Sequence, residues 1–139
     1  MKRRTGFTLV ELVVVVMIIG LLVAIAAPKM LNVMGDATQN SARMSLNVIR
    51  NAIETYSSQN AGALPPNTEA GLKTALEPFL RGPFPTSSVG TQTADIKISA
   101  AEPLVGDDST GWMWNGTTGE FIINCTDNSE DGVTKYSEF

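Results

Sequence analysis

The stretch Gly6-Phe7-Thr8-Leu9-Val10-Glu11-Leu12 opens an apolar run that continues without a break to Ala27. From residue 7 to residue 27 there is no proline, and Glu11 is the one ionisable residue. As a helix this run is about 31 Å long, which matches a hydrocarbon core of about 30 Å. A bilayer forces the backbone to satisfy its hydrogen bonds internally, so we expect a membrane-spanning helix despite the many β-branched residues.

The flanks of this run predict its orientation. Three basic residues precede it, namely Lys2, Arg3 and Arg4. Basic flanks stay in the cytoplasm, so we expect the chain after Pro28 on the outer side of the membrane. A secretory signal peptide cut near residues 24–26 is one alternative, but its apolar region would be unusually long. A plain single-span anchor is another, and it leaves the ionisable Glu11 without a purpose.

The segment Lys2-Arg3-Arg4-Thr5-Gly6-Phe7-Thr8-Leu9-Val10-Glu11 resembles the processing site of type IV pilins and type II secretion pseudopilins. The resemblance implies that a prepilin peptidase cleaves between Gly6 and Phe7 and that the new terminal Phe7 is N-methylated. It places Glu11 at the acidic position of that family. Several matches in fixed register are more specific than one short motif.

Cleavage after Gly6 would leave Phe7 with a free α-amino group, largely protonated at neutral pH, beside an apolar helix. When such helices pack in a filament, Glu11 of one subunit can meet the amine of Phe7 on a neighbour. Either charge is unfavourable in a low dielectric without the other, so we predict that the pair sets the register of assembly. The alternative is a Glu11 side chain that merely snorkels to the lipid head groups.

Gly20 and Pro28 fall where the same family carries its glycine and proline. A glycine inside a helix costs about 1 kcal/mol relative to alanine, and a proline removes an internal hydrogen bond. The segment between them is therefore predicted to be the softest part of the helix. The alternative is that Pro28 simply marks the exit from the bilayer.

Beyond the membrane the helical pattern continues on one apolar face, formed by Ala42, Leu46, Ile49, Ile53 and Tyr56. Residues 61–66 contain glycine and proline, so this amphipathic helix should stop near Asn60. Asn67 or Thr68 is then expected to cap a short helix that carries Leu72 and Leu76. The segment 64–72 also resembles the post-helix segment of major pseudopilins.

Three short strands are expected in the remainder of the chain. Residues 94–100 alternate between apolar and polar, and the runs 111–115 and 120–125 flank an Asn-Gly turn that suits a hairpin. We predict antiparallel pairing throughout, with one face of the sheet covered by the amphipathic half of the long helix.

The expected fold class is therefore α+β and pilin-like, with one long N-terminal α-helix packed on a small antiparallel β-sheet. The first half of that helix is transmembrane and the second half is amphipathic. The predicted organisation is a leader at 1–6, a transmembrane or filament-core helix at 7–27, its amphipathic continuation at 28–60, and a small head at 61–139.

Composition excludes several kinds of function. The chain has no histidine, one cysteine and a net charge of −4. These counts argue against His-based catalysis, most zinc sites and nucleic-acid binding. Cys125 has no adjacent cation to activate it, so we interpret it as a small apolar residue at a strand end. No cluster of acid, base and nucleophile indicates an enzyme.

A calcium site is the one metal site that the sequence suggests. The spacing of a calcium loop is matched by Asp127, Ser129, Asp131 and Glu138, with a glycine at the sixth position. Major pseudopilins carry a calcium site in a C-terminal loop, and Asp107 and Asp108 form a second acidic loop that is an alternative location. The flanking helices of a calcium loop are missing, however, and composition favours a solvated acidic tail without a metal.

We therefore predict a structural subunit of a type IV pilus-like filament, most simply a pseudopilin of a type II secretion system. Its expected partners are further copies of itself, other pilins or pseudopilins, the prepilin peptidase and an inner-membrane assembly platform. We expect it in the bacterial inner membrane, with the N-terminus cytoplasmic and the head periplasmic, and with the filament periplasmic or extracellular after assembly. The alternatives are a major or minor pilin of a surface fibre, or a plain membrane-anchored or secreted binding domain.

Overall fold

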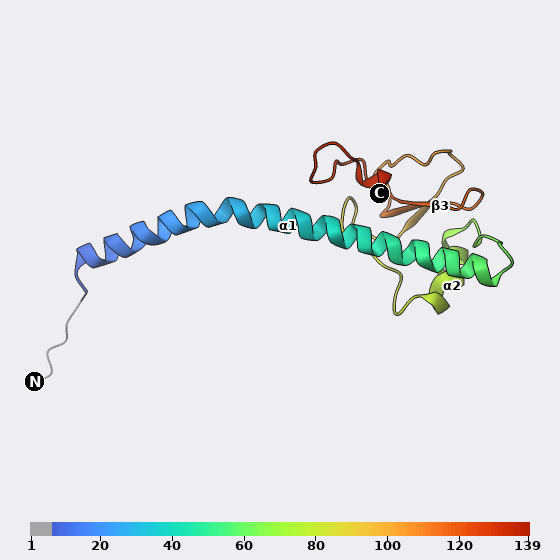
Figure 1. Cartoon of the computed structure of the whole chain (residues 1–139), viewed down its shortest axis with the longest axis horizontal. Helices are drawn as coiled ribbons and strands as arrows, with labels where there is room; N and C mark the ends of the chain where they lie inside the picture. The colour runs from blue at the N-terminus through green and yellow to red at the C-terminus, as the bar shows by residue number, and fades with distance from the viewer. Residues whose placement is uncertain (1–6) are drawn as a thin grey trace, which may run out of the picture. The chain divides into compact units, whose positions relative to one another are not determined.

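The computed structural model describes residues 7–139, which form one long helix and a small mixed α/β head (Figure 1). The elements in chain order are α1 (Leu9–Gln59), α2 (Glu69–Leu76), η1 (Glu77–Phe79), β1 (Ile96–Ile98), β2 (Trp112–Asn115), β3 (Glu120–Ile123) and η2 (Tyr136–Glu138). The chain divides into two compact units, one ending at Gly35 and the other spanning Asp36–Phe139. Helix α1 contributes to both units.

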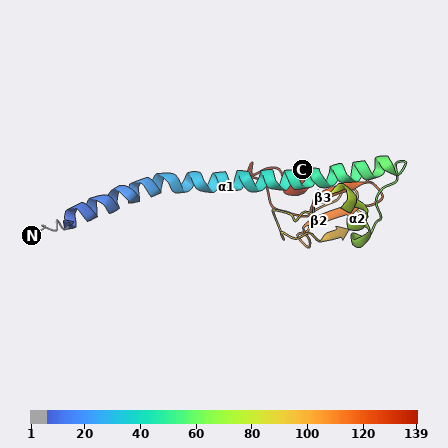
Figure 2. The same ribbon diagram turned by 90° about the horizontal axis from the view of Figure 1, so that it is seen from below.

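In the second unit, α1 buries the apolar face that its sequence predicts. Ala42, Leu46 and Ile49 are fully or almost fully buried, Ile53 is 5% exposed, and Tyr56 packs against them at the edge. Residues spaced by three and four lie on one side of a helix, which is why this pattern makes a continuous apolar stripe. Figure 2 shows the sheet and α2 along one side of this part of α1.

The end of α1 and the start of α2 follow local sequence signals. Asn60 closes the last turn, because its backbone N–H and its side-chain amide both donate to the Tyr56 carbonyl, at 3.0 and 2.8 Å. Thr68 is the N-cap of α2 and its hydroxyl accepts a hydrogen bond from the Gly71 N–H at 3.2 Å. Leu72 and Leu76, the two apolar residues expected on this helix, are fully buried.

The sheet has three strands in the order β1-β2-β3, as expected in number, but its pairing is mixed. Strands β2 and β3 are antiparallel and form the predicted hairpin, whereas β1 and β2 are parallel, so the prediction of a wholly antiparallel sheet is wrong for β1. A parallel pair needs a crossover of about a dozen residues or more, and the segment 99–111 is long enough to provide it. Its composition resembles that of any surface loop, so nothing local revealed the crossover.

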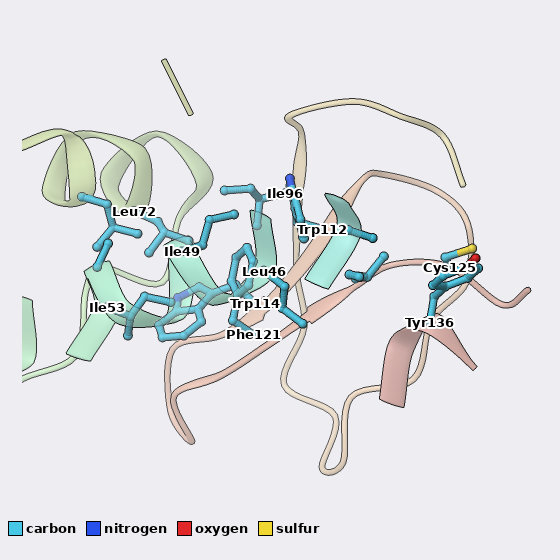
Figure 3. Close-up of a cluster of buried hydrophobic side chains, with 14 of the residues drawn as sticks. Leu46, Ile49, Ile53, Leu72, Ile96, Trp112, Trp114, Phe121, Cys125 and Tyr136 are labelled. Carbon is cyan, nitrogen blue, oxygen red and sulfur yellow. The ribbon is translucent and has the colours of Figure 1, made fainter. Parts of the chain in front are cut away.

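Both faces of this sheet are covered. Trp112, Trp114 and Phe121 face α1 and share one apolar cluster with its buried stripe and with Leu72 of α2 (Figure 3). On the opposite face, Met113 of β2 and Ile122 of β3 pack with Leu104 from the crossover segment. The long helix thus covers one face, as predicted, and the crossover covers the other, which the sequence analysis did not anticipate.

Candidate functional site

Helix α1 begins with reciprocal hydrogen bonds between Thr8 and Glu11. The Glu11 backbone N–H donates to Thr8 Oγ1 at 3.2 Å, and the Glu11 carboxylate accepts from the Thr8 backbone N–H and hydroxyl, both at 2.9 Å. This arrangement is a capping box, which satisfies N–H groups that have no partner inside the helix. In the described chain, the Glu11 carboxylate is therefore held at the N-terminus of its own helix.

The residues around the predicted cleavage point are only partly described. Phe7 is 85% exposed and precedes the helix. Gly6, the expected leader residue, and the basic residues Lys2, Arg3 and Arg4 lie outside the described residues. Cleavage between Gly6 and Phe7, methylation of Phe7 and pairing of its amine with Glu11 therefore remain predictions.

The apolar side chains in the first part of α1 are exposed in the described structure. Every large apolar side chain from Leu9 to Ile25 is at least 45% exposed. Among residues 7–139, Leu9–Ala27 is the helical segment that is long and apolar enough to cross a membrane, judged by length and composition. A surface this large and this apolar marks contact with lipid or with other proteins.

Gly20 and Pro28 both lie within α1, whose assigned helix runs through them without interruption. A Cβ added at Gly20 would meet nothing within 4 Å, so no packing contact in the described chain requires a glycine there. The predicted softness of the segment between the two residues is a property of motion, and it stays a prediction.

The C-terminal acidic loop directs its carboxylates at its own backbone. Asp131 Oδ1 accepts hydrogen bonds from Ser129 Oγ at 2.9 Å and from the N–H groups of Val133 and Thr134, both at 2.8 Å. The Val133 N–H is the main cause that lowers the pKa of the Asp131 carboxyl below its usual value. Glu138 accepts from the Lys135 N–H at 3.4 Å, at the start of η2. These contacts describe a tight turn stabilised by its own N–H groups.

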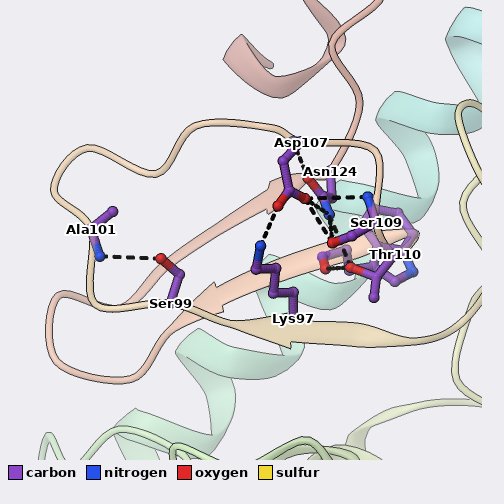
Figure 4. Close-up of polar contacts among 8 residues, drawn as sticks. Lys97, Ser99, Ala101, Asp107, Ser109, Thr110 and Asn124 are labelled. Atoms are coloured by element: carbon purple, nitrogen blue, oxygen red, sulfur yellow. Dashed lines mark hydrogen bonds and ion pairs between the residues drawn. The ribbon is translucent and has the colours of Figure 1, made fainter.

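The alternative acidic loop is bound to β1 and to the residues that follow β3 (Figure 4). Asp107 forms an ion pair with Lys97 of β1, and its other oxygen accepts from Ser109 Oγ at 2.7 Å and from the Asn124 side-chain amide at 2.8 Å. The Lys97 ammonium is the largest cause that holds the pKa of the Asp107 carboxyl well below its usual range. Asp108 binds the hydroxyl and the backbone N–H of Thr126.

Neither loop fits a calcium ion as it is arranged. Calcium takes six to eight oxygen ligands. Here both carboxylate oxygens of Asp107 and of Asp108, and Oδ1 of Asp131, already accept hydrogen bonds from N–H and O–H groups of the chain. No group of three or more acidic or cysteine side chains placed to hold a metal occurs within residues 7–139.

Sequence reasoning missed Thr8, Lys97 and Asn124. The signal for Thr8 was present, because Thr-x-x-Glu at the start of an apolar helix is the pattern of a capping box. The signal for Lys97 was partial: its place between two inward-facing isoleucines predicts that it points to the opposite face of the sheet. Asn124 had none, because burial of an asparagine depends on which partners the fold supplies. Cys125 is buried with a free thiol, and burial raises the pKa of that thiol.

Comparison with known proteins finds a known motif at the N-terminus and relatives of part of the chain. The model of the prokaryotic N-terminal methylation motif matches residues 1–27. The chain is similar to proteins of secretion systems and of pili. It is 36% identical over 73 residues to type II secretion system core protein G of Vibrio cholerae serotype O1, a match that covers 52% of this chain and 49% of the relative. It is 31% identical over 86 residues to the protein of the same name from Aeromonas hydrophila, covering 62% and 59%.

A pilus component is also similar to this chain. The chain is 38% identical over 60 residues to the type IV narrow pilus major component PilA5 of Thermus thermophilus, a match that covers 43% of this chain and 52% of the relative. The chain spans about half the length of the curated relatives that it matches. No solved structure matches it. The relatives are named as components of a secretion system and of pili.

Proposed function

We propose that this protein is pilin-like and is a non-enzymatic pseudopilin, a subunit that polymerises into a filament of a type II secretion system. The observation that carries the proposal is the helix Leu9–Ala27, whose apolar side chains are exposed, directly after a segment that matches the N-terminal methylation motif. Such a helix needs a bilayer before assembly and neighbouring helices after it. The similarity of the chain to two type II secretion system core G proteins favours a filament of that system over other filaments.

The proposed assembly chemistry centres on Phe7 and Glu11. A prepilin peptidase cleaves after Gly6, the new amine of Phe7 is methylated, and the amine then meets the Glu11 carboxylate of an adjacent subunit. Before assembly Glu11 is held by Thr8, so the carboxylate exchanges hydrogen bonds to Thr8 for an ion pair. Because an unpaired charge among packed apolar helices is unfavourable, the pair selects one axial register. A head-to-tail contact that does not close then extends the polymer.

The proposed location follows from the same segment. Before assembly, the chain lies in the bacterial inner membrane with its N-terminus in the cytoplasm and residues 36–139 in the periplasm. The Lys2-Arg3-Arg4 cluster supports this orientation through the positive-inside rule. An inner-membrane assembly platform and other pseudopilins are the proposed partners in extracting the helix from the membrane.

Mass spectrometry of the N-terminal peptide of the membrane-associated protein tests the processing step. We expect the mature chain to begin at Phe7 with one added methyl group. A mature chain that begins at Ala27 would identify a secretory signal peptide, and an intact Met1 would identify a plain anchor. Either result contradicts the filament proposal.

Assembly is tested with Glu11→Ala in cells that produce the filament. We expect normal membrane insertion and normal cleavage, with filament yield reduced at least about tenfold, because each subunit would place an uncompensated amine among apolar helices. Glu11→Asp is the matched control, since it keeps the charge and shortens the side chain by one methylene group. Unchanged filament yield in Glu11→Ala would refute the pairing of Glu11 with Phe7.

A pilin of a surface fibre is the second candidate, and the match to the narrow pilus component of Thermus thermophilus favours it. Deletion of the gene separates the two candidates. Loss of proteins from the culture medium with surface fibres unchanged supports the pseudopilin. Loss of surface fibres with secretion unchanged supports the pilin.

A further inference from the structure

The segment that crosses from β1 to β2 carries two adjacent acidic residues, Asp107 and Asp108. They lie in a head that already has an excess of acidic residues. Two neighbouring carboxylates repel each other unless something compensates their charge. In many proteins a divalent cation does so, but here each carboxylate already binds groups of the chain.

The positive charge at this loop comes from β1. Strand β1 directs Ile96 and Ile98 toward the main apolar cluster, so Lys97 between them points to the other face of the sheet, where the crossover lies. Its ammonium forms an ion pair with Asp107 Oδ2. Both side chains are about two-fifths exposed, at 42% and 40%. The Lys97 ammonium of β1 therefore provides the positive charge beside this loop.

A buried amide completes the arrangement. Asn124, which is fully buried, accepts the Asp107 backbone N–H at 2.7 Å through Oδ1. Its Nδ2 donates to Asp107 Oδ1 at 2.8 Å and to Thr110 Oγ1 at 3.0 Å. The Asn124 amide thus occupies the inner side of Asp107, while the Lys97 ammonium occupies its outer side. A calcium ion at Asp107 would compete with both groups for the carboxylate oxygens.

The crossover also lies very close to the end of β3. A Cβ on Gly106 would come within 2.9 to 3.1 Å of the backbone of Cys125, so the loop passes there only because residue 106 is glycine. Two residues further along, Asp108 accepts hydrogen bonds from the Thr126 N–H at 2.9 Å and from its hydroxyl. Asp107 and Asp108 therefore both join the crossover to residues 124–126 through hydrogen bonds.

We infer that the Lys97 ammonium, together with the Asn124 amide, organises the acidic crossover loop 106–110, and that this head is stable without calcium. This inference does not depend on the proposed filament function. It differs from what the resemblance to major pseudopilins implies, because the charge compensation that a bound ion would provide comes from a lysine of the sheet.

Thermal unfolding of the full chain in detergent micelles, followed by the fluorescence of Trp112 and Trp114, tests the inference. We expect the wild-type midpoint to be the same with excess calcium and with a calcium chelator. A bound ion would raise the midpoint progressively with its concentration. Lys97→Met should lower the midpoint by about 1 to 4 °C in both conditions, as expected for a partly exposed ion pair in a small domain.

Two variants serve as controls. Lys97→Arg keeps the charge and should retain most of the wild-type midpoint. Arg81→Met removes one positive charge from an exposed position in another loop and should leave the midpoint unchanged. In the double variant Lys97→Met with Asp107→Asn, the loss should be smaller than the sum of the two single losses, because the two groups interact directly.

Two results would overturn the inference. One is a wild-type midpoint that rises with calcium and falls with the chelator. The other is a Lys97→Met midpoint equal to that of Arg81→Met. If Lys97→Met does not fold, the effect of calcium on the unfolding midpoints of the wild type and of Lys97→Arg still tests the inference. Because none of these measurements involves leader cleavage or polymerisation, their failure is distinct from a failure of the proposed function.

Discussion

At the scale of single residues, Glu11 has one partner in the described chain and a different one in the proposed filament. In the described chain its carboxylate closes the capping box with Thr8. In the proposed filament it meets the amine of Phe7 on a neighbour. The capping box stabilises the first turn of α1 and gives the carboxylate hydrogen bonds while no amine is present. The Glu11 carboxylate must therefore give up its hydrogen bonds to Thr8 before it can pair with the amine in the proposed filament.

Replacing Thr8 tests this role. Thr8→Val keeps the shape and removes the hydroxyl, so the first turn of α1 should fray and the amides of residues 9–11 should exchange about five-fold faster. Hydrogen exchange measured by NMR in micelles reports the difference. Thr8→Ser, which keeps the hydroxyl, is the control and should resemble the wild type. Equal exchange in Thr8→Val and Thr8→Ser would show that the hydroxyl does not cap the helix.

Asp131 gives a prediction about pH. Its pKa is lowered in the folded chain, chiefly by the Val133 N–H, so its ionised form stabilises the fold. That contribution is complete above the unfolded pKa of about 3.9 and is lost as the pH falls from there toward the folded value. Asp131→Asn cannot ionise, so the wild type should exceed it in melting temperature at pH 7. The gap should shrink as the solution is acidified below about pH 4, and a gap that does not change with pH would contradict this account.

At the scale of elements, Arg50 joins α1 to two later parts of the head. Its Nε and Nη2 donate to the Phe121 carbonyl of β3 at 3.0 and 2.9 Å, and its Nη1 donates to the Phe139 carbonyl at 2.7 Å. The Phe121 carbonyl is not used within the β2–β3 pair, so the guanidinium caps an outer edge of the sheet. Arg43, two turns earlier, lies over the Phe139 ring at 3.7 Å.

We expect Arg50→Met to lower the free energy of unfolding by about 2 kcal/mol, because it removes charge-assisted hydrogen bonds and leaves two carbonyls without a donor. Chemical denaturation with tryptophan fluorescence measures the change. Arg81→Met is the matched control, since it removes the same charge from an exposed loop position. A loss no greater than that of the control would mean that water replaces the guanidinium at both carbonyls.

The elements also show where sequence reasoning succeeded and where it failed. The stripe of α1 and the caps near Asn60 and Thr68 were predicted, because helix periodicity and capping are local properties. The parallel pairing of β1 with β2 was not, because strand direction depends on the path of the crossover and on what covers the second face. Leu104 provides that cover, and its partners Met113 and Ile122 are distant in sequence.

At the scale of the whole molecule, the core of the head depends on the later part of α1. Among the residues whose side chains are described, Ala42 is the first that is buried in the core. The unit Asp36–Phe139 therefore contains the complete described core, including the stripe of α1 that covers the sheet.

A fragment comprising residues 36–139 should accordingly be soluble and unfold cooperatively on heating. It keeps the covered face of the sheet and lacks the exposed apolar surface of Leu9–Ala27. A fragment of residues 51–139 is the control, since it loses Ala42, Leu46 and Ile49 and uncovers Trp112 and Trp114. Circular dichroism should show a cooperative transition for the longer fragment alone. Cooperative unfolding of the shorter one would mean that α1 is dispensable for the head.

The sequence by itself determined the properties that depend on composition and on near neighbours along the chain. These are the apolar span, its resemblance to a methylated N-terminus, the amphipathic stripe, the caps and the β2–β3 hairpin. Tertiary structure alone decided the direction of β1, the second covered face of the sheet, the burial of Asn124 and the pairing of Lys97 with Asp107. The physical reason is that these features require groups far apart in sequence to meet. Whether a carboxylate binds a metal, a lysine or a backbone N–H depends on which of them the fold brings within reach.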